Sequence, residues 1–374
     1  MSTDVLAPDE VRAALRDYFS DHPGLAETRR LRDGDHAVAE AGFDRARWSD
    51  LAGEVGLAAM GAPAEADGLG LGLEHLVAAL EECGTTLYPG PARAAALLAW
   101  SSGLTADRSD RLGEAVTRLV EGAAVPAFAQ FEGAGRDSLE LSADGLLRGR
   151  VRGVTHATAA DLLLAVAGAP DGPRVVVADL GAGGVRRALS RGVDFAGVTG
   201  ELELGGVPAT ALTEPGDTAA VARFDTAARI LLAAEQVGGA EGCLRESVSY
   251  ALVRTQFGRL IGGYQAVQHR CARTAVAVAS AKALVSAAAR AVDDDEDSAR
   301  MLGLLAKAEA SDVFQEAADG LVQVCGGIGF TWEHDAHLFF RKARSTAVLG
   351  GTSARLRHQA VEDGCLNLIR PATT

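Results

Sequence analysis

The chain of 374 residues is poor in aromatic residues, in cysteine and in positive charge. Aromatic residues make up 5% of it, and 36 lysines and arginines stand against 50 acidic residues, which gives a net charge of −14. Binding to a phosphate backbone needs a basic surface, so this charge argues against nucleic acid as a partner. With 48% hydrophobic residues, the chain is long and apolar enough for two or three packed domains.

Cysteine and histidine, which bind zinc and other transition metals, are also scarce. The spacing of His334 and His337, without further ligands nearby in the sequence, favours packing roles, so no metal site is predicted. The start of the chain lacks an apolar signal segment, and no uncharged apolar run has the roughly 18–20 residues of a membrane span. We therefore expect a cytoplasmic protein without a membrane span. The cysteines, which we expect to be reduced thiols, are Cys83, Cys243, Cys271, Cys325 and Cys365.

Hydrophobic periodicity divides the chain into three parts. Helical spacing dominates residues 1–121, short apolar or alternating segments fill 122–221, and helical spacing returns over 222–374. This order predicts an N-terminal helical domain, a middle β domain and a C-terminal helical domain. Helices are expected at 9–22, 45–55, 74–83, 92–103 and 108–121, and from 225 almost to the end. Strands are expected at 124–131, 138–141, 146–154, 162–167 and 174–178, continuing over 193–204 and 210.

Glycines and polar residues recur in the last third, at the ends of its expected helices. The motifs are Arg254-Thr-Gln-Phe-Gly258, Gly262-Gly-Tyr-Gln265, Gln323-Val-Cys-Gly-Gly-Ile-Gly-Phe330 and Leu349-Gly-Gly-Thr352. The Arg254 guanidinium could bind a pyrophosphate through two hydrogen bonds, with Phe257 covering an adenine ring. Glycine backbone at 326 and 327 allows a nucleotide to approach closely. Each residue taken alone favours a role in helix packing, but the full spaced set favours contact with a dinucleotide.

The order and spacing of these motifs resemble the acyl-CoA dehydrogenase family. The resemblance implies an α+β fold with a middle β-barrel or sheet domain and a C-terminal four-helix bundle. It also implies FAD as the cofactor and an acyl-CoA thioester as the substrate. In this family the motifs contact the adenine half of the FAD of a neighbouring subunit. The resemblance assigns that role to Arg254, Phe257, Gln265, Gln323, Gly326 and Gly327. Two further cofactor-binding residues are implied, Thr352 after the final glycines and Thr155 in the β domain.

The resemblance also shows that the family's catalytic base is missing. Removal of an α proton from a thioester needs a carboxylate in a dry pocket. In many members this Glu precedes the final Gly-Thr pair, where this chain has Gly350. In other members it precedes an arginine that matches Arg229, and this chain has Ala228 there. Glu235, about two helical turns further on, is a weak candidate that we expect to be structural.

A second departure lies in the β domain. An aromatic residue of the family that supports the flavin ring corresponds to Gly153, and residues 128–137 match the family poorly. Residues for a neighbour's FAD are therefore present, whereas those for the chain's own flavin and substrate are lost. The chain resembles the short, base-lacking subunit of actinobacterial α2β2 acyl-CoA dehydrogenases, some of which act on steroid side chains. Its expected partner is a second family chain that carries the catalytic Glu.

Two other functions remain open. The chain could be a self-sufficient flavoenzyme of another chemistry, such as a monooxygenase that needs no Glu base. Alternatively, it could be an inert structural paralogue without flavin. The acyl group is not specified by the sequence.

Overall fold

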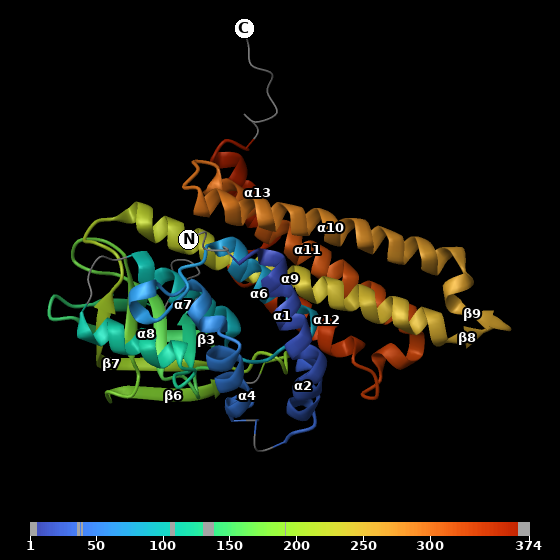
Figure 1. Cartoon of the computed structure of the whole chain (residues 1–374), viewed down its shortest axis with the longest axis horizontal. Helices are drawn as coiled ribbons and strands as arrows, with labels where there is room; N and C mark the ends of the chain where they lie inside the picture. Colours follow the sequence, from blue (N-terminus) through green and yellow to red (C-terminus); the bar gives the residue numbers. More distant parts are fainter. Residues whose placement is uncertain are drawn as a thin grey trace, which may run out of the picture.

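A computed structural model describes residues 6–35, 38, 40–104, 109–129, 138–190 and 192–365. N-terminal helices, a curled mixed sheet and a long helical domain follow one another along the chain (Figure 1). This arrangement confirms the predicted fold class. The sheet strands lie between Pro126 and Ala211, and the first long helix of the C-terminal part begins at Thr218.

The N-terminal helices pack around one apolar core. The first helix buries Val11, Leu15 and Phe19, which recur at helical spacing as the sequence predicts. A second helix, α2, was not predicted, because only one of its four buried residues, Leu31, is a large apolar residue. The helices are α1 (Pro8–Asp21), α2 (Gly24–Arg32), α4 (Arg45–Ser49), continued by a π-helical turn (Asp50–Glu54), α5 (Leu57–Gly61), α6 (Leu73–Thr85), α7 (Ala92–Ser101) and α8 (Asp110–Val120).

The sheet has seven strands, and β7 is its longest member. The order is β1-β4-β5-β7-β3-β2, with β6 paired to β7, and β1 and β4 are parallel. The strands are β1 (Pro126–Ala129), β2 (Ser138–Leu141), β3 (Leu146–Thr155), β4 (Leu162–Ala167), β5 (Arg174–Asp179), β6 (Val185–Ser190) and β7 (Thr199–Ala211).

Two predictions in this region were wrong. Strand β6 was missed because most of its side chains are exposed, so it shows no alternation of apolar and polar residues. The segment 193–198 was predicted as strand but forms bends, in which the Asp194 carboxylate accepts a hydrogen bond from the amide of Ala196. Because of these bends Asp194 lies at the edge of a cavity.

The C-terminal part consists of long helices and a short hairpin. The helix α9 begins seven residues before the predicted start, because the Asp217 side chain caps it by accepting from the amide of Ala220. The elements are α9 (Thr218–Val253), the strands β8 (Thr255–Gln256) and β9 (Arg259–Leu260), α10 (Gln265–Asp293), α11 (Ala299–Cys325), α12 (Ala336–Thr346) and α13 (Ser353–Glu362). Figure 1 shows the hairpin projecting at one end of this bundle.

Helices α6 and α9 cross at very close range. A Cβ atom added to Gly238 of α9 would lie 2.0 Å from the carbonyl oxygen of Glu81, and one added to Gly84 of α6 would lie 2.1 Å from that of Glu235. Only glycine fits at both positions, because no side chain could be accommodated without moving a helix. This contact packs the N-terminal helices against the helix that carries Glu235.

The helix α10 is long and apolar enough, by length and composition alone, to cross a membrane. A single helix of this kind is weak evidence, because core helices of soluble proteins pass the same test. In the structure its Lys282 forms ion pairs with Glu241 of α9 and Glu81 of α6. One face of α10 therefore packs against other helices through a charged side chain as well as apolar ones.

Candidate functional site

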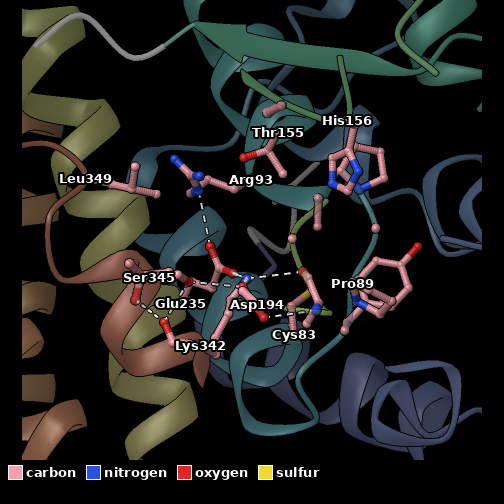
Figure 2. Close-up of a pocket in the computed structure, with 18 of the residues that line it drawn as sticks. Cys83, Pro89, Arg93, Thr155, His156, Asp194, Glu235, Lys342, Ser345 and Leu349 are labelled. Atoms are coloured by element: carbon pink, nitrogen blue, oxygen red, sulfur yellow. Dashed lines mark hydrogen bonds and ion pairs between the residues drawn. The ribbon is translucent and has the colours of Figure 1, made fainter. Parts of the chain in front are cut away.

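A buried cluster of charges lies where the three parts of the chain meet. The Glu235 carboxylate of α9 is 3.1 Å from Arg93 Nε of α7 and 2.8 Å from Lys342 Nζ of α12. The Asp194 carboxylate, from the bend before β7, lies 3.8 Å from the same Lys342 nitrogen. Figure 2 shows Glu235 between Arg93 and Lys342. The cluster borders a cavity of about 100 Å³, and it brings together side chains from four distant segments.

The pairing makes Glu235 a poor general base. Burial by itself would raise the pKa of the Glu235 carboxyl, but Lys342 and Arg93 outweigh burial and lower it. Burial would likewise lower the pKa of Lys342, and Glu235 and Asp194 raise it instead. Both oxygens of Glu235 are thus bound to cations, which hold it ionised but occupy the lone pairs that a proton would need. This geometry favours the structural role expected for Glu235.

His156 faces the same cavity as a neutral ring. Its side chain is 3% exposed, and burial, together with Lys342, lowers its pKa to about 3. Its backbone is left-handed (φ 62°), a conformation uncommon outside glycine in which asparagine, aspartate and histidine are enriched. The preceding residue, Thr155, also lines the cavity, on the same side as His156. Thr155, predicted to bind the cofactor, thus lies beside Glu235, which was named as a weak catalytic candidate, whereas Arg93, Lys342 and His156 were not predicted.

The two positions at which the base was sought lie next to each other. Arg229, the residue after Ala228, donates from Nε to the carbonyl oxygen of Gly350 at 3.0 Å and pairs with Asp225. Gly350 has φ 68°, a left-handed conformation that strains any residue with a side chain. Leu349, adjacent to Gly350, lines the cavity. The cavity therefore extends from Leu349, next to the base position at Gly350, to the charge cluster around Glu235.

The residues assigned to a neighbour's FAD gather elsewhere, at the hairpin end of the bundle. Phe257 at the hairpin tip is 93% exposed and left-handed (φ 51°), followed by Gly258 at φ 78°. Gln265 begins α10, whose N-terminus has no side-chain cap and carries the positive end of the helix dipole. Gln323 ends α11, and its exposed neighbours Gly326 and Gly327 follow it. A ring contact between Tyr250 and His334 joins the end of α9 to this segment.

This end of the bundle carries unpaired positive charge on an acidic protein. Most arginines in the described part of the chain pair with a carboxylate. Within those same residues the side chains of Arg254, Arg270 and Arg273 form no ion pair or hydrogen bond, and Arg259 only stacks on Tyr264 at 3.9 Å. The patch of Arg254, Arg259, Arg270 and Arg273 is therefore suited to a phosphate-bearing ligand.

The predicted cofactor residues thus form two separate groups. Thr352 stands at the N-cap position of α13 without a side-chain cap hydrogen bond, two residues after Gly350, and Thr155 lines the cavity. Arg254 lies about seven helical turns, roughly 37 Å, further along α9 than Arg229. The two groups face different regions of the molecule. Of the segment 128–137, residues 130–137 lie outside the described part.

Other sequence-based expectations concern cysteine and histidine. All five cysteines are unpaired. His334 accepts a hydrogen bond from the amide of Ala336 and contacts Cys325 Sγ, while His337 stacks on Trp332. Within the described residues no group of three or more His, Cys, Asp or Glu side chains could hold a metal ion.

The cations of the cluster had only a weak signal in the sequence. Arg93 is a single charge in an alanine-rich helix, and Lys342 and Asp194 stand among ordinary surface-like charges. Nothing in the sequence indicates that they meet, since Arg93, Asp194 and Lys342 lie 142, 41 and 107 residues from Glu235 along the chain.

Residues 216–363 match the family model "Acyl-CoA dehydrogenase, C-terminal domain". The chain is 32% identical to acyl-CoA dehydrogenase IpdE2 of Mycobacterium tuberculosis, over 92% of this chain and 94% of that protein. The chain belongs to the acyl-CoA dehydrogenase family. Its fold is similar to a solved variant of the steroid ACAD Tcur3481-Tcur3483 (TM-score 0.84, 26% identity, covering 97% and 99% of the two chains). The ChsE4-ChsE5 complex of M. tuberculosis gives the same TM-score and identity, covering 99% of each chain.

FAD is the cofactor of this family, and the two groups of residues differ in how well they fit it. The hairpin end offers unpaired guanidinium groups, an exposed aromatic ring and glycine backbone, which suit a pyrophosphate and an adenine. Gly153, where the resemblance places the supporting aromatic residue, is left-handed with open space at its Cβ position and offers no side chain to a flavin ring. The described residues at the hairpin end therefore suit the adenine half of the cofactor, whereas Gly153 cannot support its ring.

The neutral state of buried His156 predicts a pH dependence of stability. Because its pKa is about 3 when folded and about 6.5 when unfolded, the unfolded state binds more protons between these values. The free energy of unfolding then falls as pH drops below about 6.5, by about 2 kcal/mol at pH 5 from this residue. Denaturant titrations of wild type and His156→Asn, which tolerates the backbone conformation, should show a shallower acid loss in the variant. Parallel pH profiles would contradict this assignment.

Proposed function

We propose that this chain is the base-lacking subunit of a heteromeric, FAD-dependent acyl-CoA dehydrogenase in the cytoplasm. A partner chain of the same family supplies the catalytic Glu, and this chain completes the partner's FAD site with its hairpin end. The observation that carries the proposal is the separation of the two groups of residues. The residues at the hairpin end can bind an anion, whereas both base positions, Ala228 and Gly350, lack a carboxylate.

The hairpin end also has the apolar surface that a partner chain would cover. Large side chains there are strongly exposed, with Phe257 at 93%, Phe330 at 84% and Val253 at 74%. Soluble proteins seldom leave such groups together unless they meet a partner. The same surface carries the unpaired arginines, so one docking event would bury the apolar groups and bring the guanidiniums to the partner's cofactor.

Relatives support both the heteromer and the substrate class. The similar structures include a steroid ACAD whose name joins two chains and a complex of ChsE4 with ChsE5. The cavity of this chain, about 100 Å³, is smaller than the roughly 150 Å³ that holds one benzene. A bulky acyl group such as a steroid side chain would therefore react in the partner's site, not in this one.

In the assembled site, each chain has a distinct task. Bound FAD would supply the oxidant that takes a hydride from the β carbon of the acyl group, while the partner's Glu would take the α proton. In this chain Arg254 would bind the pyrophosphate, Phe257 would cover the adenine, and Gln323 and the backbone of Gly326 would hold the adenosine.

Loss of Arg254 should weaken cofactor retention without preventing assembly. Hydrogen bonds to a charged group contribute about 1.5–3 kcal/mol, so Arg254→Ala should raise the Kd for FAD about tenfold or more in the complex. The measurement is flavin absorbance after dialysis, with fluorescence titration of the apo-complex. Arg111→Ala removes another exposed, unpaired arginine outside this surface and serves as the control. Equal FAD retention in the two variants would refute the role of Arg254.

A Glu placed at position 350 should not restore activity to this chain. Gly350→Glu would force a side chain into a left-handed conformation, at a cost of about 1–2 kcal/mol. The flavin ring would still lack support at Gly153. In a complex whose partner Glu is replaced by Gln, acyl-CoA oxidation with an artificial electron acceptor should stay at background. Turnover from the single substitution would show that the chain's own site is intact.

A further inference from the structure

Strand β6 is a free edge of the sheet. It pairs with β7 on one side, from Val185 opposite Leu204 to Ser190 opposite Thr199. Within the described residues, no backbone or side-chain group forms a hydrogen bond to its outer side. Figure 1 shows β6 beyond β7, at the margin of the sheet. A free edge of this kind is a template on which another extended segment can pair.

The ladder with β7 determines which backbone groups of β6 point outward. The carbonyl oxygen of Gly184, just before β6, accepts from the amide of Gly205 at 2.8 Å. Hydrogen-bonded pairs alternate along an antiparallel ladder, so Ala188 also bonds to β7. In agreement, a Cβ atom added to Gly200 of β7 would lie 2.7 Å from the carbonyl oxygen of Ala188. The residues whose amides and carbonyls point away from the sheet are therefore Val185, Arg187 and Leu189.

Exposed edges are usually protected by prolines, bulges or a covering segment, and β6 has none of these among the described residues. Residues 186–189 are all exposed, and the pairing with β7 keeps one register. The charged residues of β6 are both basic, Arg186 and Arg187. The Arg187 guanidinium donates to the carbonyl oxygens of Ala160 and Leu180, and no described carboxylate balances it. A second copy of β6 would bring like charges together, which is unfavourable.

Positive charge surrounds this edge. Strands β3, β7 and β6 are neighbours, and five arginines on them stand against two glutamates, Glu201 and Glu203 of β7. Glu201 pairs with two of the arginines and Glu203 with one. The acidic residue of β2, Glu140, lies beyond β3, farther from the edge. The arginines are Arg148, Arg150, Arg152, Arg186 and Arg187. On a chain with a net charge of −14, this part of the sheet therefore has a local excess of positive charge.

The two faces of β6 set the pattern of a matching strand. On the solvent face Arg186 is 80% exposed. On the other face Val185 packs against the core of the sheet, and Leu189 is 53% exposed. Side chains on the same face of neighbouring strands lie side by side. A matching strand therefore places acidic side chains on the solvent face and apolar ones on the other, in alternation.

We propose that β6 is a docking edge for an extended segment of another protein in which acidic residues alternate with apolar ones. The segment would add a strand to the sheet, bonding to the outward amides and carbonyls of β6, with its carboxylates beside Arg186. The inference goes beyond the proposed function, because β6 and the hairpin lie toward opposite ends of the molecule (Figure 1). Docking at β6 would leave the hairpin end accessible to the partner chain.

Two labelled peptides test the proposal on the full-length chain. In the acidic probe Glu alternates with Val, in the basic probe Lys replaces each Glu, and terminal prolines keep both from pairing with themselves. Fluorescence anisotropy should show the acidic probe binding about tenfold tighter or more, with a difference that shrinks as the salt concentration rises. Equal binding of the two probes, or binding of neither, would overturn the proposal.

Variants of β6 locate the bound probe. Leu189→Pro removes one outward amide without removing a bond to β7, a substitution that edge strands accept, and should weaken the acidic probe about tenfold. Leu189→Ala, which shortens the side chain but keeps the amide, is the matched control and should weaken it less. Arg186→Gln should weaken the acidic probe about threefold. Arg111→Gln, an exposed arginine outside the sheet, should leave the affinity unchanged.

Two outcomes would refute the assignment to β6. Unchanged affinity in both Leu189→Pro and Arg186→Gln would place the probe elsewhere on the protein. Sedimentation velocity measures self-association, and an assembly that dissociates in Leu189→Pro but not in Leu189→Ala would identify a second copy of this chain as the occupant. Circular dichroism checks the fold of each variant, and if Leu189→Pro does not fold, Arg186→Gln and the salt dependence decide.

Discussion

One continuous helix, α9, sets the distance between the two groups of residues that this family uses around its cofactor. Its 36 residues place Arg229 beside the base loop and Arg254 at the hairpin. A helix of this length is stiff, because each turn is held by its own hydrogen bonds and by packing on α6, α10 and α11. The hairpin therefore projects at the end of the bundle (Figure 1), and in our proposal its residues contact the cofactor of the chain that docks on it.

The centre of the chain is stabilised differently. Arg93, Glu235, Lys342 and Asp194 come from the N-terminal, C-terminal and middle parts, and their charges balance in a buried space. Removing one member would leave an unpaired buried charge, which typically costs about 3–5 kcal/mol. The close crossing of α6 and α9 at Gly84 and Gly238 brings these segments together.

The sequence predicted the repetitive features of the fold well. The strands 138–141 and 162–167 are confirmed at the residue level, because their apolar residues are bounded by turn residues. The exposed strand β6 and the helix α2 carry no such pattern and were missed. The cofactor role of the hairpin residues stays a prediction, which rests on their contiguous motifs. The partners of Glu235 could not be predicted, because Arg93, Lys342 and Asp194 are brought to it only by tertiary packing.

The central claim is that this chain completes a partner's FAD site and has no complete site of its own. Flavin stoichiometry tests it most directly. FAD absorbance per chain would be measured for the chain alone and for its complex with a family member that carries the catalytic Glu. We predict a flavin-free chain alone and about one FAD per pair of chains in the complex. One FAD per chain in a homo-oligomer would contradict the account and point to a self-sufficient flavoenzyme.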